Sequence, residues 1–120
     1  MAHVIAFVDD LFFQAKLVET AKQLEVDLRT CTTPDALDVE IAKAKPKLVV
    51  VDLNARNNPL DAVERMRLHA GEVPLLGFFS HVQVDLAERA RAAGCHDVIP
   101  RSKLTRDLAT ILVQAKSQSR

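Results

Sequence analysis

The sequence predicts an α/β fold in which five parallel strands alternate with five helices. Three short, almost continuously apolar runs carry this prediction, at residues 3–8, 47–51 and 73–79. Each run has the length of a strand and lacks polar alternation, which is typical of strands buried on both faces of a parallel sheet. Helix-like segments separate the runs, and this alternation indicates helices on both faces of one sheet.

In the first half of the chain, the first strand precedes a helical pattern over about 12–24, and a weaker strand candidate follows at 26–31. The second helix is expected to begin at Thr33, because this capping hydroxyl is followed by a proline at the first helical position. It ends before Pro46, directly ahead of the third strand.

In the second half, a third helix is expected to begin after a capping Asn58, again with a proline at its first position, and to end near residue 71. The fourth helix is predicted over about 84–93 and stops at the glycine that follows it. A weaker strand candidate lies at 96–99, and the fifth helix is predicted from about Thr105.

Composition limits the classes of function. The chain has 120 residues, of which 48% are apolar, with 16 basic and 16 acidic side chains, so a single domain spanning 1–120 is expected. Balanced charge and the lack of Trp and Tyr disfavour nucleic-acid binding. No apolar run approaches the ~18 residues of a membrane span, and no signal-peptide pattern opens the chain. We therefore expect no membrane contact, a cytoplasmic location, and reduced, buried thiols at Cys31 and Cys95.

Carboxylates follow two strands that are neighbours in a flavodoxin-like, doubly wound sheet, whose strand order is 2-1-3-4-5. Asp9 and Asp10 come directly after the first strand, and Asp52 follows the third. Ligands bind beyond the carboxyl ends of parallel strands, so these side chains are expected to meet in one concavity. Their repulsion calls for a cation or a basic side chain, and Mg²⁺ prefers such oxygen ligands. The alternative is that the aspartates only cap helices, as Asp10 can do.

Other phosphate-binding and catalytic patterns are missing from the sequence. A flavodoxin would carry a Ser-, Thr- or Gly-rich loop after the first strand, where this chain has two aspartates. The Rossmann pattern Gly-x-Gly-x-x-Gly, an Asp-x-Asp pair after the first strand, and the nucleophile elbow Gly-x-Ser-x-Gly do not occur.

The order and spacing of these residues resemble the receiver domain of response regulators over essentially the whole chain. The resemblance rests on Val8-Asp9-Asp10, on Val51-Asp52-Leu53, on Pro74 before the fourth strand, and on the segment 92–97 that leads into the fifth. It implies a flavodoxin-like fold and a two-component signalling module. It implies no enzyme activity beyond weak autophosphorylation and autodephosphorylation.

The resemblance also implies a role for each acidic residue. Asp52 falls at the phosphoacceptor position, Asp9 and Asp10 fall at the pair that binds Mg²⁺ or its substitute Mn²⁺, and Asn54 falls where a backbone carbonyl completes the metal site. Asp52 would accept a phosphoryl group from a histidine kinase or a small phosphodonor. The acyl phosphate would then switch a surface for an effector protein or output domain, and a homodimer through the fourth helix, fifth strand and fifth helix is a further implication.

The half of the site that senses the phosphoryl group departs from the family pattern. Phe79 stands where receivers carry Ser or Thr, so only a slip or bulge would present the hydroxyl of Ser80. Arg101 stands at the position of the family's lysine, with Lys103 as a fallback if the loop is remodelled. Val98 replaces the aromatic switch residue. These departures support an alternative in which a degenerate receiver acts as a phosphorylation-independent protein–protein interaction module.

The four histidines show no ligand spacing. His3, His69 and His96 are scattered along the chain and are expected to be structural. His81 follows Ser80 near the expected rim of the site, where a solvated loop residue is the simpler interpretation and a phosphate or metal contact the sharper one.

Overall fold

The five strands form one parallel sheet in the order β2-β1-β3-β4-β5. The computed structural model describes residues 3–80 and 85–117. The elements are β1 (Val4–Phe7), α1 (Leu11–Gln23), β2 (Leu28–Cys31), α2 (Pro34–Ala44), β3 (Leu48–Asp52), α3 (Pro59–Ala70), β4 (Leu75–Phe79), α4 (Leu86–Ala93), β5 (Asp97–Pro100) and α5 (Arg101–Ser117). Strand order, parallel pairing and alternation with helices confirm the predicted flavodoxin-like fold.

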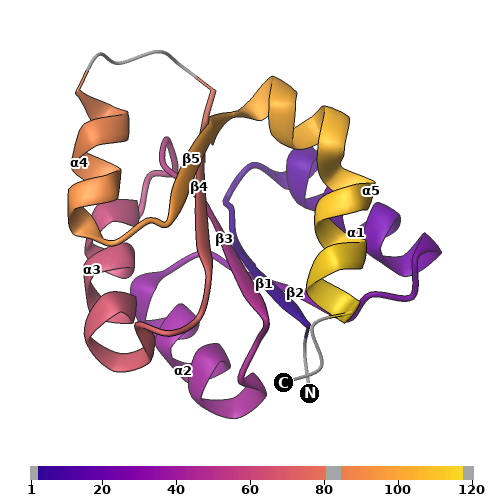
Figure 1. Ribbon diagram of the computed structural model, residues 1–120, viewed down its shortest axis with the longest axis horizontal. Coiled ribbons are helices and arrows are strands. Elements are labelled where there is room, and N and C mark those ends of the chain that lie inside the picture. Colours follow the sequence, from indigo (N-terminus) through magenta and orange to yellow (C-terminus); the bar gives the residue numbers. More distant parts are fainter. Residues whose placement is uncertain (1–2, 81–84, 118–120) are drawn as a thin grey trace.

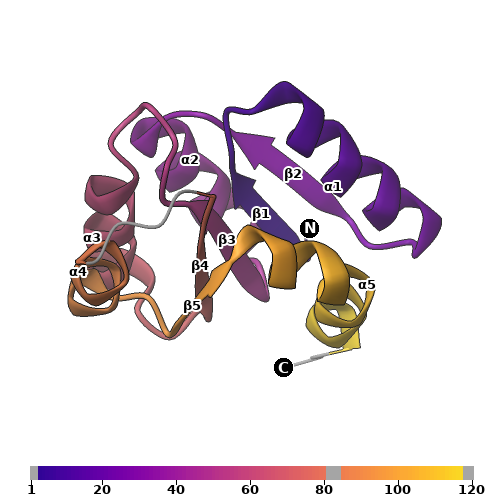
Figure 2. The same cartoon turned by 90° about the horizontal axis from the view of Figure 1, so that it is seen from above.

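Helices cover both faces of the sheet (Figure 1). One layer holds α1 and α5, and the other holds α2, α3 and α4, as the view from above also shows (Figure 2). Successive side chains of a strand enter opposite layers: Ile5 and Phe7 belong to the α2–α4 core, whereas Val4 and Ala6 belong to the α1–α5 core. The core residues expected from the sequence are all buried, namely Val49, Val50, Val51, Leu75 and Leu76.

Helix capping follows the sequence at α2 but not at α3. The hydroxyl of Thr33 accepts a hydrogen bond from the Ala36 amide at 3.1 Å, as predicted. Asn58 adopts a left-handed conformation, with φ of 58°, and its side chain makes no capping hydrogen bond, so that prediction was wrong. Asn tolerates this conformation, and its backbone carbonyl still accepts the first helical bond, from Ala62 at 3.1 Å.

The fifth helix begins at Arg101, so the predicted start at Thr105 was wrong. The buried stripe of this helix begins with Leu104, one turn ahead of Leu108, so the helix extends further toward its amino end than predicted. The earlier start matters for the site, because it places Arg101 in the first turn of α5 at the carboxyl edge of the sheet.

Two further expectations concern membranes and thiols. Within residues 3–80 and 85–117, no helix has the length and apolarity that crossing a membrane requires. Cys31 and Cys95 are both unpaired and buried. Burial raises the pKa of Cys31 to about 12 and that of Cys95 to about 11, which keeps both thiols protonated and unreactive at neutral pH.

Candidate functional site

The predicted acidic residues lie at the carboxyl ends of β1 and β3, the edge of the sheet opposite the two chain termini (Figure 1). Asp52 is the last residue of β3 and is 5% exposed, and it is the only buried charged side chain in the described part of the chain. Asp9 and Asp10 lie in the connection from β1 to α1 and are half-buried. The buried, apolar strand β3 thus ends in the carboxylate of Asp52.

The environment of Asp52 opposes its ionisation. Burial is the main cause that raises the pKa of this carboxyl, and the negative charges of Asp9 and Asp10 raise it further. The backbone amide of Asn54 donates to Oδ1 of Asp52 at 2.9 Å and lowers the pKa of this carboxyl. The guanidinium of Arg101 lowers it as well. All three carboxylates lie at this edge of the sheet, because Asp9 and Asp10 follow β1 and Asp52 ends the neighbouring strand β3.

Asp10 has two structural partners. Its Oδ1 accepts hydrogen bonds from the amides of Phe12 at 3.0 Å and Phe13 at 3.2 Å, so it caps α1. Its Oδ2 lies 3.2 Å from Nη2 of Arg101. The Phe13 amide is the largest cause that lowers the pKa of Asp10, and Arg101 lowers it further. Asp10 therefore caps α1, as its position allows, and also pairs with Arg101.

Asp9 joins two loops of the site. Its Oδ2 accepts a hydrogen bond from the backbone amide of Arg56 at 2.9 Å. Arg56 belongs to the loop between β3 and α3, so this bond ties the β1–α1 connection to the segment that follows Asp52.

Arg101, for which the family resemblance predicts a contact with the phosphoryl group, lies against Asp10 and Phe13. Its guanidinium carbon lies 4.1 Å from the centroid of the Phe13 ring, and that ring packs against Phe78 with centroids 5.2 Å apart. The stacking on Phe13 has no signal in the sequence, because the two residues lie at opposite ends of the chain. Lys103 is exposed, and its charge lowers the pKa of Asp107 within α5.

The end of β4 shows no bulge. Phe79 is in register with Pro100 of β5 and packs, half-buried, against the α2–α4 core. Ser80 is exposed, and its backbone amide donates to Oδ1 of Asn54 at 2.7 Å. The sequence interpretation used only the backbone carbonyl of Asn54 and missed this side-chain contact between the β3 and β4 loops. His81 lies outside the described residues.

The donor atoms of this edge match a hard divalent cation in kind. Mg²⁺ is usually held by one or two carboxylates and several waters, and here three carboxylates follow the neighbouring strands β1 and β3. In residues 3–80 and 85–117, however, no three acidic, His or Cys side chains lie close enough to hold a metal together. The reason is visible at Asp10, whose oxygens are turned to the α1 amides and to Arg101.

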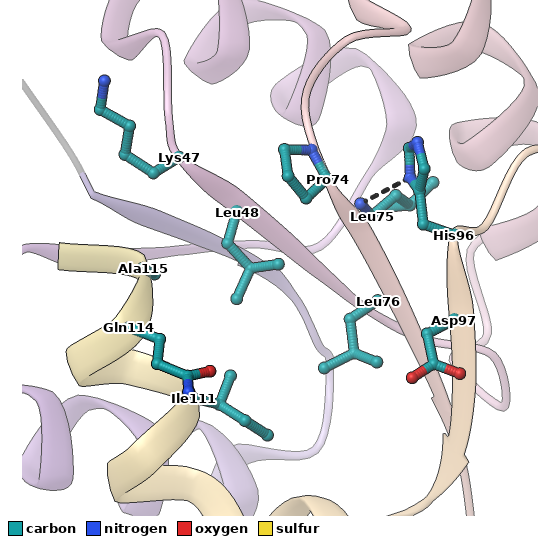
Figure 3. A pocket seen from close by; sticks show the side chains of 10 residues that line it. All are labelled: Lys47, Leu48, Pro74, Leu75, Leu76, His96, Asp97, Ile111, Gln114 and Ala115. Atoms are coloured by element: carbon teal, nitrogen blue, oxygen red, sulfur yellow. Dashed lines mark hydrogen bonds between the residues drawn. The ribbon is translucent and has the colours of Figure 1, made fainter. Parts of the chain in front are cut away.

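A cavity of about 210 Å³ lies at the opposite, amino-terminal edge of the sheet (Figure 3). Leu48 and Leu76 point from the strands toward Ile111 of α5, and Lys47 and Asp97 lie at its rim. None of the site residues predicted from the sequence lines this cavity, so the chemistry expected of the chain lies at the carboxyl edge.

Comparison with known proteins identifies the fold. No family model and no curated protein matches the chain. Among solved structures, the receiver domain of NtrX from Brucella abortus is similar with a TM-score of 0.79 at 18% identity, covering 97% of this chain and 99% of that one.

Two further structures agree. A CheY-like response regulator receiver domain protein from Methanospirillum hungatei JF-1 has a TM-score of 0.79 at 10% identity over 99% of both chains. The beryllofluoride-activated NtrC4 receiver domain dimer has a TM-score of 0.77 at 12% identity, covering 96% of this chain and 99% of that one. The chain therefore has the fold of response-regulator receiver domains.

Proposed function

We propose that residues 1–120 form a single receiver domain of two-component signalling in which Asp52 accepts a phosphoryl group from a histidine kinase or a small phosphodonor. The observation that carries this proposal is the position of Asp52, a buried carboxylate at the end of a central strand, beside Asp9 and Asp10. A buried carboxylate whose ionisation is opposed by its surroundings is the kind of group that functional sites maintain. The receiver fold supports the same assignment.

The transfer needs little from the protein beyond positioning. A carboxylate oxygen of Asp52 attacks the phosphorus atom, the bond from phosphorus to the donor's nitrogen or oxygen breaks, and an acyl phosphate forms as the donor leaves with its electron pair. The Asn54 amide fixes the Asp52 carboxylate through Oδ1. Asp9, Asp10, Asp52 and the Asn54 carbonyl would hold Mg²⁺ or Mn²⁺ only after their side chains draw together and Arg101 leaves Asp10, and the ion would then neutralise charge on the phosphoryl oxygens.

The groups that would contact the transferred phosphoryl are Arg101 and Ser80. The guanidinium of Arg101 is a planar fork that matches phosphate geometry and already lies in the pocket. Ser80 follows β4 directly and is exposed. The acyl phosphate would alter the surface formed by α4, β5 and α5, through which an effector protein, an output domain or a second copy of the chain would bind.

A second candidate function is a phosphorylation-independent protein–protein interaction module. The regular end of β4 favours it, because Phe79 takes the position at which a hydroxyl would reach the phosphoryl group. A phosphoryl oxygen that lacks this donor loses a charge-assisted hydrogen bond worth about 1.5–3 kcal/mol. The ion pair of Arg101 with Asp10 favours it as well, because it neutralises part of the acidic pocket without a ligand.

Intact-mass measurement after incubation with acetyl phosphate and Mg²⁺ separates the two functions. We expect the wild-type protein to gain the mass of one phosphoryl group and the Asp52→Asn variant to gain none. Asp61→Asn, which changes an exposed carboxylate in the first turn of α3, is the matched control and should behave as wild type. A wild-type protein that gains no phosphoryl mass, or an Asp52→Asn variant that still gains it, would contradict the phosphoacceptor role.

A further inference from the structure

Arg101 is held at the acidic pocket by two independent contacts. Its Nη2 lies 3.2 Å from Oδ2 of Asp10, and its guanidinium carbon stacks 4.1 Å above the centre of the Phe13 ring. Phe13 is itself buried and packs against Phe78 of β4. Ion pair and ring therefore fix the guanidinium between α5 and the start of α1, where Asp10 is the cap.

These contacts place the guanidinium on a carboxylate that a metal ion would use. Oδ1 of Asp10 accepts from the amides of α1, so Oδ2 is the oxygen left for a cation, and Arg101 holds it. A divalent cation that approaches Oδ2 must displace the guanidinium or bind beside another positive charge. Both alternatives weaken its binding.

We propose that Arg101 is a positioning residue that lowers the affinity of the pocket for divalent cations, because it acts as an internal counter-ion to Asp10. The inference rests on the metal-binding part of the proposed function. It assigns to this chain a pocket whose negative charge is partly neutralised at all times, so that cation binding depends on the release of Arg101 from Phe13 and Asp10.

Arginine is better suited than lysine to this role. Its guanidinium is planar, weakly hydrated and able to stack on an aromatic ring while its edge bonds to a carboxylate. A lysine ammonium is a compact, strongly hydrated point charge that cannot stack as a plane. Arg101→Lys keeps the charge and loses the stacked plane, so this substitution separates the effect of charge from the effect of position.

The test is titration of Mg²⁺ into chelator-treated protein without a phosphodonor, with the dissociation constant measured by calorimetry. Arg101→Ala is expected to bind Mg²⁺ about tenfold more tightly than wild type, a moderate gain because the pair is about one-third exposed and partly screened. Arg101→Lys should lie between the two proteins.

Arg106→Ala is the matched control, because it removes the same charge from the next turn of the same helix. Arg106 is exposed and pairs with its neighbour Asp107 at 3.1 Å. Its affinity for Mg²⁺ should remain within twofold of wild type.

Phe13→Leu tests the stacking separately, because it keeps an apolar side chain while it removes the ring under the guanidinium. It should tighten Mg²⁺ binding about threefold, and the double variant with Arg101→Ala should bind no more tightly than Arg101→Ala alone. If Phe13→Leu does not fold, the comparison of Arg101→Ala with Arg106→Ala decides the matter.

Three results would overturn the inference: an unchanged affinity in Arg101→Ala, an equal gain in Arg101→Ala and Arg106→Ala, or no measurable Mg²⁺ binding in any variant. The proposed function fails in a different way. If Arg101→Ala tightens Mg²⁺ binding while acetyl phosphate leaves no adduct on Asp52, the counter-ion role stands and the phosphoacceptor role does not.

Discussion

At the amino-terminal edge of the sheet two histidines extend the outer strand pairs, whereas the carboxyl edge carries three aspartates and the guanidinium of Arg101, which pairs with Asp10. The backbone amide of His3 donates to the carbonyl of Asp27 at 2.8 Å, and Nδ1 of His3 accepts the Asp27 amide at 2.9 Å. His96 repeats this exchange with Leu75 at 2.9 and 3.0 Å (Figure 3). Both histidines therefore have the structural role that the sequence predicted.

The carboxyl edge carries charge that the fold does not neutralise fully. Burial and the neighbouring aspartates oppose the ionisation of Asp52, and the guanidinium of Arg101, which lies 3.2 Å from Asp10, offsets only part of this negative charge. The amino edge satisfies backbone groups with neutral partners and so stabilises the sheet, while the carboxyl edge costs stability. Such an opposition is expected where one end of a sheet holds the fold and the other end performs the chemistry. Substitution of Asp52 should accordingly differ in sign from substitutions at the amino edge.

The largest effect is expected at the amino edge, where Gly94 ends α4 and leads into β5. Its φ is 137°, a conformation that residues with side chains rarely adopt, and an added Cβ would lie 3.0 Å from Cδ of Arg67. Gly94→Ala should therefore lower the free energy of unfolding by about 2–3 kcal/mol, measured by urea denaturation.

A double variant separates the two causes at Gly94. Arg67→Ala removes the outer part of the side chain that the new methyl group would meet, so Gly94→Ala should cost less in that background. Backbone strain remains there. A Gly94→Ala protein as stable as wild type would show that the turn between α4 and β5 can relax and is not rigid.

The next effect concerns the histidine exchange itself. His96→Ala leaves the part-buried amide of Leu75 without the imidazole acceptor, so the free energy of unfolding should fall by about 1–2 kcal/mol. His69→Ala, at an exposed position in the last turn of α3, is the control and should stay within about 0.5 kcal/mol of wild type. Equal losses of free energy of unfolding in the two variants would show that the hydrogen bond of His96 has no structural role beyond that of an exposed histidine.

The difference between the edges also explains how much the sequence could predict. Strand order and the placement of Asp9, Asp10 and Asp52 at one edge of the sheet follow from apolar runs and from topology, because the carboxyl ends of parallel strands meet there. The stacking of Arg101 on Phe13 depends on how α5 lies against α1, and a local pattern contains no record of that packing.

The same limit applies to smaller features of the two edges. Asn58 is of a residue type that caps helices and stands at the N-cap position of α3, and only the structure shows that its side chain makes no capping hydrogen bond. The side-chain bond between Asn54 and the Ser80 amide joins two loops and depends on their approach in space. The sequence therefore predicts which residues meet at an edge, while their partners within it depend on tertiary packing.

At the carboxyl edge the expected effect is smaller and has the opposite sign. Asp52→Asn removes a buried carboxylate that the charges of Asp9 and Asp10 repel. The new side chain keeps an oxygen that can accept the hydrogen bond from the Asn54 backbone amide. In metal-free buffer at neutral pH the free energy of unfolding should rise by roughly 1 kcal/mol. A destabilised variant would mean that the Asp52 carboxylate makes a net favourable contribution, and the two edges would then not differ in sign.

The smallest effect is the pH dependence of that gain. The pKa of Asp52 is raised in the folded protein above its ordinary value of 3.8. At a pH between 3.8 and the folded pKa, the Asp52 carboxyl is ionised in the unfolded chain and protonated in the folded protein. The free energy of unfolding therefore falls as the pH rises through this range. The advantage of Asp52→Asn should therefore be absent below pH 3.8 and reach its full size above the folded pKa.

Asp10 provides the opposite case within the same pocket. Its pKa is lowered by the Phe13 amide and by Arg101, so its ionised form contributes stability that is present above the ordinary value and is lost as the pH falls through the folded pKa. Asp10→Asn should be less stable than wild type at neutral pH, with a deficit that shrinks on acidification. Urea denaturation of the three proteins between pH 3 and pH 7.5 measures both trends, and parallel curves for the two variants would show that Asp52 and Asp10 respond to one shared field instead of to separate partners.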